Sequence, residues 1–404
     1  MLRDRYEPMN LFTYIPTLSI RIDPVLTQID TLLDDHVLFQ AVKADLSKRC
    51  PHTASDGRPS MPVEVILCLL VVKPLYGWSF PQTTHFVSAS LVLRQFYRVS
   101  VAPVPDQSTL HRWAKLIQPA TLHRLLDHLV SLAYQLQVMQ GRKLRLDGTV
   151  VETDIHHPTD RTLLNDGVRV LSRALCTAKH LLRDGAALPQ DVLTDCTQQA
   201  RQQMKRMMAV ARQQGDEAAE RLKATSRALV PLTTTVVTRA QQAQAALVAQ
   251  ATTPAQQVAA RLAQYVPLVE QVIAQTTRRV LQGEQVPAHE KLVSLCEPHP
   301  AIMRQGKPGK PTECGRVLWL AEVDGGLISQ YAVLEGNADE KVHLPPSVDH
   351  HRQQFGHPPA VLAGDRGLHA ASNERYARGT GITEVVLPKP GRKSAKRIAY
   401  EQQD

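Results

Sequence analysis

The chain has 404 residues, which is room for two or three domains, and its apolar fraction of 43% with only 4% aromatics predicts mostly aliphatic cores. A formal net charge of +9 favours a polyanionic partner, and six scattered cysteines without a Cys-x-x-Cys pair exclude the usual zinc spacing and disfavour a disulfide framework. The sequence lacks both an apolar run of roughly 20 residues and the apolar core of a signal peptide, so we expect a cytoplasmic protein with no membrane partner.

The first 140 residues predict a short arm followed by an all-helical domain. Residues 1–22 have no strong period and form the arm. Residues 23–140 form the helical domain, which opens at Asp23-Pro24 because proline suits a first helical turn. A wide apolar stripe over 63–71 supplies its core. A helix over 106–118, capped by Asp106, could read DNA, although a packing helix with a solvated face is an equal alternative.

The middle of the chain predicts one strand and then a long helical insertion. Residues 144–152 alternate and carry β-branched side chains, as a strand does. Residues 161–299 are rich in Ala, Gln, Arg and Leu, and their helical spacing is typical of long antiparallel helices in a bundle. Breaks at glycines and prolines indicate several helices rather than one rod.

The last third predicts a β-hairpin over 316–335, because Asp324-Gly325 separates two alternating apolar runs. A helix over 339–355, a strand over 361–363, a helix over 369–378 and a strand over 382–387 follow. Without the insertion this order matches a ribonuclease-H-like catalytic core, made of residues 141–160 and 300–390, with a basic tail over 391–404. The predicted fold class is therefore α+β, and the first strand should lie beside the strand that ends at Asp365.

Asp147 and Asp365 each follow a short apolar strand and precede a turn. Two Mg²⁺ ions held by such carboxylates at a sheet edge can activate an attacking oxygen and stabilise the leaving oxygen. For either aspartate taken alone, an ordinary turn residue is the favoured interpretation, and it is the two together that indicate a metal site. His156, His157 and Asp160 could form a metal cluster, but local turn and capping roles are favoured because they lie nine or more residues beyond Asp147.

Several blocks of sequence resemble insertion-sequence transposases of the DDE class, in particular the ISNCY-like group. The resemblance runs from about residue 20 onward. The block LDGTVVETDIHHPTD from Leu146 resembles the one with the first catalytic acid, and VLAGDRGLH from Val361 resembles the one with the second. GRPSMPVEVIL from Gly57 and LYGWSF from Leu75 resemble the helical domain of that group, and GKPGKPTECGRVLW from Gly306 resembles its loop before the hairpin.

The resemblance implies a DNA transposase that cuts and joins insertion-sequence ends by two-metal hydrolysis and strand transfer, without a covalent intermediate. Asp147 and Asp365 would hold Mg²⁺ or Mn²⁺. The partners would be double-stranded DNA, as terminal inverted repeats and target DNA, and further copies of the chain. The class carries a third acid, a glutamate on a later helix. The sequence ends at Asp404 before such a helix, so we expect a truncated copy without the third acid, with Glu401 as the poorly supported substitute.

Cations that would meet DNA phosphates lie in the candidate recognition helix, the loops and the tail. They are Arg112, Lys115, Lys307, Lys310, Arg366, Lys389, Arg392 and Lys393. A solvated tail is the alternative for the last of these. Two other functions stay open, namely a catalytically inactive DNA-binding transposase remnant and a general ribonuclease-H-like nuclease.

Overall fold

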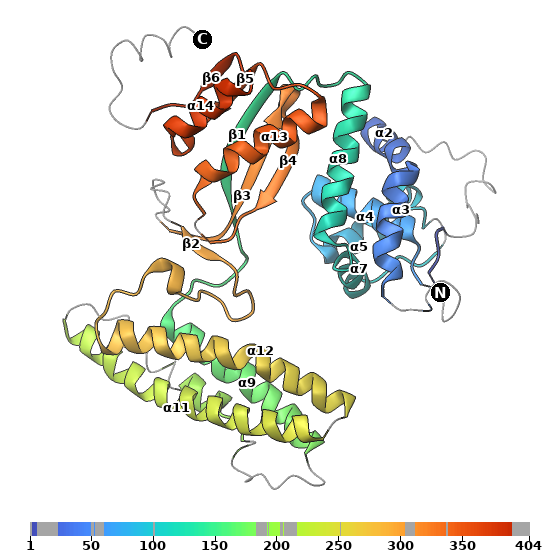
Figure 1. The fold of residues 1–404 in the computed structure, drawn as a ribbon. Helices are drawn as coiled ribbons and strands as arrows, with labels where there is room; N and C mark the ends of the chain where they lie inside the picture. The colour runs from blue at the N-terminus through green and yellow to red at the C-terminus, as the bar shows by residue number, and fades with distance from the viewer. Residues whose placement is uncertain are drawn as a thin grey trace. The chain divides into compact units, whose positions relative to one another are not determined.

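The computed structural model describes residues 2–5, 23–49, 52, 60–99, 102–182, 192, 194–202, 205, 216–250, 252–303, 312–336 and 338–389. Helices and a mixed sheet confirm the α+β class (Figure 1). The chain divides into two compact units. The first comprises Met1–Leu146, Leu320–Tyr331 and Lys341–Asp404, and the second comprises Asp147–Trp319 and Ala332–Glu340.

The first unit begins with helices whose starts are set by side-chain caps. Asp23 accepts a hydrogen bond from the Val25 amide at 2.7 Å, and Ser79 forms a capping box with Gln82. The helices are α2 (Pro24–Leu33), α3 (His36–Ser47), α4 (Val63–Leu75), α5 (Phe80–Ala89), α6 (Leu91–Phe96), α7 (Gln107–Ala114) and α8 (Pro119–Gln135). α4 is apolar all round, and a helix of that kind is stable only when its neighbours cover it. It is accordingly the centre of the core of this unit.

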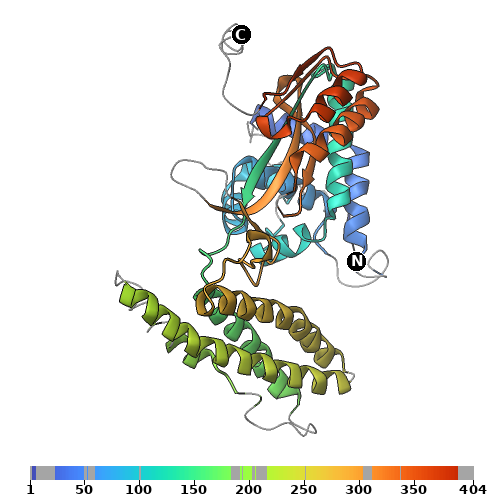
Figure 2. The ribbon, with the colours of Figure 1, turned by 60° about the vertical axis from the view of Figure 1, so that its left-hand side comes forward.

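The sheet has the order β2-β3-β1-β5-β6, with β4 paired to β3. Its strands are β1 (Lys143–Glu152), β2 (Ala301–Met303), β3 (Glu313–Val323), β4 (Leu327–Val333), β5 (Val361–Gly364) and β6 (Glu384–Val386). β5 runs parallel to both β1 and β6, whereas β2 is antiparallel to β3. The parallel pairs follow helical crossovers, α13 (Leu344–Phe355) before β5 and α14 (Ala371–Gly379) before β6. The two helices pack against each other (Figure 2).

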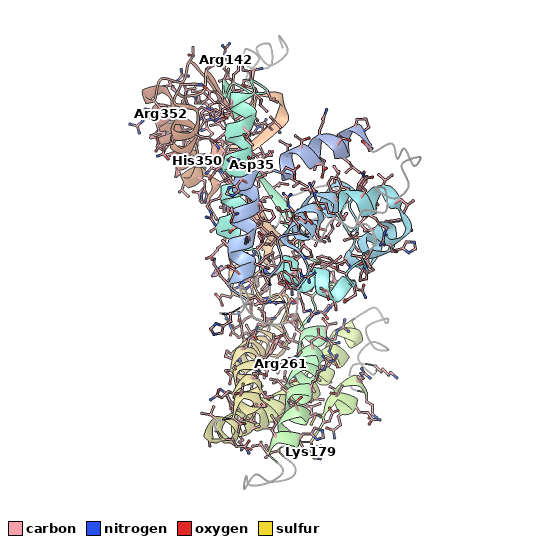
Figure 3. All side chains as sticks on the ribbon, turned by 90° about the vertical axis from the view of Figure 1, so that its right-hand side faces the viewer. Asp35, Arg142, Lys179, Arg261, His350 and Arg352 are labelled. Atoms are coloured by element: carbon pink, nitrogen blue, oxygen red, sulfur yellow. The ribbon has the colours of Figure 1, made fainter. Side chains whose placement is uncertain are left out.

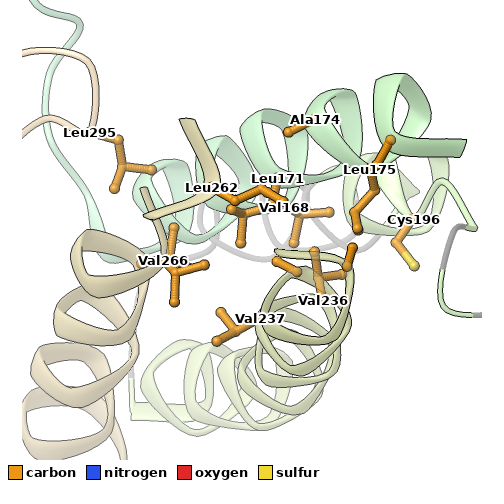
Figure 4. Packing of buried hydrophobic residues seen from close by; sticks show 14 of the residues in the cluster. Val168, Leu171, Ala174, Leu175, Cys196, Val236, Val237, Leu262, Val266 and Leu295 are labelled. Carbon is orange, nitrogen blue, oxygen red and sulfur yellow. The ribbon is translucent and has the colours of Figure 1, made fainter. Parts of the chain in front are cut away.

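Three long helices of the second unit form a bundle that lies between β1 and β2 in the sequence. They are α9 (Asp160–Leu181), α11 (Asp216–Ala249) and α12 (Thr253–Thr276), and they lie side by side in Figures 1 and 2. Val168 and Leu171 of α9 face Val236 of α11 and Leu262 of α12 in a shared aliphatic core (Figure 4). Small side chains let the helices approach closely, which explains the Ala-rich composition of this segment.

Most predicted elements are confirmed with small shifts at their ends. The candidate recognition helix is shorter than predicted, because α7 ends at Ala114. The region predicted as one helix over 339–355 is a 3₁₀ turn, Glu340–His343, followed by α13. The three-residue strand β2 was not predicted, because so short a segment carries no alternation. A ribonuclease-H-like core with a helical insertion stays a prediction.

Among the described residues, no single helix is long and apolar enough to cross a membrane. α4 and α5 meet that standard only as a pair bent by 108°.

Candidate catalytic site

Parallel pairing of β1 with β5 sets the register of the two predicted catalytic aspartates. Asp365 directly follows β5, whereas Asp147 lies within β1 and does not precede a turn as predicted, because β1 continues to Glu152. The register runs from Lys143 opposite Val361 to Leu146 opposite Gly364. Leu144 and Leu146 are buried in the core. A shift of the register by one residue would turn these side chains to the other face of the sheet, so their burial fixes the pairing. The next residue in the chain is an aspartate after both members of the last pair, Asp147 in β1 and Asp365 after β5.

Asp365 begins the turn that follows β5. Its side chain accepts a hydrogen bond from the Leu368 amide at 3.2 Å and so caps the 3₁₀ turn Arg366–Leu368. Leu368 is fully buried and folds back over Gly364, where a β-carbon would come within 2.6 Å of the leucine side chain. A larger residue at this position would have to displace the Leu368 side chain. The Gly-Asp-Arg-Gly sequence therefore builds a tight turn that leaves the Asp365 carboxylate exposed.

A further carboxylate lies against β1 one residue beyond the first aspartate, on the opposite face of the strand from its side chain. The side chain of Glu340 covers the α-carbon of Gly148, where an added β-carbon would lie 2.3 Å from its Oε1 atom. Gly148 directly follows Asp147 in β1, so the Glu340 carboxylate lies against the backbone next to that residue. The sequence alone did not single out Glu340. Its position at the head of the turn before α13, in the acidic pair Asp339-Glu340, was the available signal.

The donor chemistry of the two aspartates fits a hard divalent cation. Mg²⁺ takes carboxylate oxygens and keeps several waters, so few protein ligands are needed. In the part of the chain that the structure describes, no three His, Cys, Asp or Glu side chains are grouped as a metal site would require. The described residues thus offer two of the three acids that the resemblance implies, and Glu401 lies outside them.

Two members of the possible metal cluster after β1, His156 and Asp160, have charged partners. His156 lies 3.3 Å from the carboxylate of Asp166, and Asp160 pairs with Arg279 at 3.0 Å. Thr159 caps α9 through a hydrogen bond from the Thr162 amide. The His156 contact and the Thr159 cap are local, as predicted, whereas Asp160 pairs with an arginine 119 positions along the chain.

The predicted DNA-contacting cations are exposed where the structure describes them. Arg112 lies on α7, where its guanidinium donates to the Ser108 carbonyl at 3.3 Å and to the Thr109 hydroxyl at 3.1 Å. Lys115 caps the end of this helix, while Leu110 and Trp113 of the same helix are buried. Arg366 and Lys389 are also exposed. Lys307, Lys310, Arg392 and Lys393 lie outside the described residues.

A family model described as "Transposase domain (DUF772)" matches residues 19–116, about a quarter of the chain. No curated protein and no solved structure matches. The matched segment contains most of the N-terminal helices, including α4 and α7, and it does not reach either aspartate. The match supports a transposase, and with it a protein that binds and processes DNA.

Proposed function

We propose that the chain is a DDE-type transposase in which Asp147 and Asp365 hold Mg²⁺ or Mn²⁺. The observation that carries this proposal is the parallel register of β1 and β5. Its last pair, Leu146 and Gly364, is followed on both strands by an aspartate. Where β5 ends beside β1, the next residue of each chain segment lies at corresponding positions of the register, so the two aspartates are candidates for one site. The transposase match over residues 19–116 supports the same function independently.

The two aspartates lie in different backbone environments, one in a strand and the other in a turn. Asp147 continues a ten-residue strand in the middle of the sheet, which gives its carboxylate a fixed position. Asp365 sits on a turn that its own side chain caps, so one of its oxygens is held by a backbone amide and the other is available. When bound, a pair of divalent ions would activate the attacking oxygen and offset charge on the leaving oxygen. Arg366, the exposed residue that follows Asp365, would contact a phosphate of the DNA.

The substrate in this proposal is double-stranded DNA that carries terminal inverted repeats, together with target DNA, and several copies of the chain would assemble on it. The net charge of +9 supports a polyanionic substrate. The exposed cations of α7 lie inside the matched transposase domain, which supports a role for that helix in holding the DNA.

The test is strand cleavage by Asp147→Asn and Asp365→Asn. Asparagine keeps an acceptor for the Leu368 amide, so the second variant removes charge without removing the cap. DNA with the element's ends is incubated with Mg²⁺ or Mn²⁺. Losing several kcal/mol of charge stabilisation should slow cleavage at least about a hundredfold in either variant.

Asp154→Asn is the matched control, because Asp154 is an exposed aspartate just beyond the same strand. Binding of Mn²⁺, followed by electron paramagnetic resonance, should weaken in the two site variants and not in this control. Cleavage at the wild-type rate by Asp365→Asn would refute the proposed metal site.

The second candidate is a DNA-binding transposase remnant without cleavage. It is favoured by the lack of a three-ligand metal group among the residues that the structure describes. DNA binding by the wild-type chain with no cleavage in either metal would support this alternative over the active enzyme.

A further inference from the structure

The second unit contains a pocket of about 1090 Å³ beside the base of the helical bundle. Its walls come from the segment after α12, from β2 and β3, and from the residues that precede α13. Ligand pockets commonly measure ~300–1,000 Å³, so this one is large enough for a nucleotide and its neighbour. No part of the function proposed above uses this pocket.

Side-chain clamps hold the wall that follows α12. Arg278 bridges Glu284 at 2.9 Å and Glu290 at 2.7 Å, which folds the intervening loop back on itself. Buried Gln275 exchanges two hydrogen bonds with the backbone of Leu292, at 2.9 and 3.2 Å. The pocket is therefore built by defined contacts and is not simply a space between loops.

The lining combines apolar surface with cations. Val286, Met303 and Val317 are buried residues of the walls and would cover the face of a planar ring. Arg279 and Lys291 also line the pocket. The apolar side chains could pack against a base, and the cations could bind its phosphate.

The charged residues of the lining are Arg279, Lys291, Glu284 and Glu340. Arg279 is matched by Asp160 at 3.0 Å, and the acid Glu284 is matched by Arg278. Within the described ranges, Lys291 makes no ion pair. A half-buried lysine that makes no ion pair is a candidate contact for a phosphate.

The size of the pocket selects a single strand. A hollow of this volume is roughly 10 Å across, narrower than the ~12 Å of the major groove alone, so a duplex cannot enter it. Glu340 is also part of the lining, and its carboxylate lies against Gly148, next to Asp147. Side chains alternate along a strand, so Glu340 and this pocket lie on the face of β1 opposite to the Asp147 side chain.

We propose that this pocket binds an unpaired nucleotide of a DNA strand, with the base against Met303 and Val317 and the phosphate on Lys291. The inference rests on the proposed function for the identity of the nucleic acid. It adds a subsite that holds one strand end outside the duplex, which the transposase match does not assign.

The test compares a duplex that carries a three-thymidine overhang with a blunt duplex of the same sequence, by fluorescence anisotropy in EDTA. The wild-type chain should prefer the overhang. Ala288→Trp, which fills the pocket, and Lys291→Gln, which removes its unmatched cation, should each weaken overhang binding about tenfold and leave blunt binding unchanged. Ala260→Trp, at an exposed alanine of α12, is the control for adding an indole to this unit and should behave as wild type.

Two native cysteines supply a second readout that does not depend on a substitution. Cys314 lines the pocket, whereas Cys176 lies on α9, and burial raises the pKa of both thiols. The overhang should slow alkylation of Cys314 by iodoacetamide and leave Cys176 unchanged, as followed by peptide mass spectrometry. Equal rates with and without the overhang would overturn the inference, and so would equal protection by free thymidine monophosphate.

Failure of this inference is separable from failure of the catalytic proposal. No metal is present in the binding test, and Asp147→Asn should keep the overhang preference. If Ala288→Trp keeps the overhang preference, the proposed nucleotide pocket is refuted, whatever the cleavage assay shows. Protection of Cys314 by the overhang together with cleavage that ignores Asp147→Asn would support the pocket and refute the metal site.

Discussion

At the scale of single residues, the support beneath β1 depends on a buried neutral histidine. His351 of α13 lies 2.8 Å from the Gly141 carbonyl through its Nε2 atom, which must therefore carry the proton. Its Nδ1 atom is buried and has no hydrogen-bond partner. Gly141 has a positive φ of 64° and lies under the ring of Phe355, so no other residue fits there without strain.

This histidine predicts a loss of stability in mild acid. Burial lowers the pKa of His351 from 6.5 to about 4, against the opposing effect of its bond to Gly141. A base whose pKa falls on folding binds fewer protons in the folded state. Its contribution is therefore complete above pH 6.5 and declines as the pH falls towards 4. Between pH 7 and pH 5 the wild type should lose roughly 2 kcal/mol of unfolding free energy relative to His351→Gln.

Urea unfolding at several pH values measures this difference. Glutamine keeps a donor for the Gly141 carbonyl but cannot be protonated, so it isolates the titration from the hydrogen bond. Parallel pH profiles for the wild type and the variant would show that the imidazole does not titrate between the folded and unfolded states.

At the scale of elements, the hairpin turn holds the start of β1. The Asp324 carboxylate accepts hydrogen bonds from the backbone amides of Gln140, Arg142 and Lys143, at 3.1, 3.0 and 2.8 Å. Burial opposes the charge of this group, but the three amides lower the pKa of Asp324 overall. Its stabilising effect is thus present above the ordinary value of 3.8 and is lost as the pH falls through the lower folded value.

Removing this carboxylate should loosen the strand that leads to Asp147. Asp324→Ala leaves three amides without an acceptor, so it should destabilise the fold by roughly 2 kcal/mol. Hydrogen exchange at those three amides should accelerate, as measured by nuclear magnetic resonance. The control Asp154→Ala removes an exposed aspartate outside the hairpin and should change neither quantity. Unchanged protection at Lys143 in Asp324→Ala would show that the hairpin does not anchor β1.

The sequence predicted this hairpin but not its anchoring role. Asp-Gly between alternating runs is a local signal, and local signals also identified α4 and the bundle helices. The bonds from Asp324 to residues 140–143 join segments about 180 positions apart, and no pattern within either segment encodes them. The same limit hid Glu340, because its approach to Gly148 depends on tertiary packing alone. Both aspartates could be proposed in advance because each directly follows a recognisable apolar run with strand character.

At the scale of the whole molecule, the excess of positive charge raises the question of which part engages DNA. The net charge of +9 is spread over the whole sequence, and both the N-terminal helices and the bundle carry exposed cations. Arg112 and Lys115 lie on α7, within the segment that matches a transposase domain. Lys179 and Arg261 lie on α9 and α12 of the bundle (Figure 3).

The salt dependence of duplex binding separates these two surfaces. Each phosphate contact that is lost reduces the slope of log affinity against log salt by about 1. Lys115→Ala should produce that change, because among the described residues this lysine makes no ion pair and its charge is available to a phosphate. Arg112→Ala should do the same if the guanidinium leaves its contacts with Ser108 and Thr109 to reach DNA. Lys179→Ala and Arg261→Ala are matched exposed cations and should keep the wild-type slope. If the salt-dependence slope changes only in the bundle variants, the bundle binds the DNA and α7 is a packing helix with a solvated face.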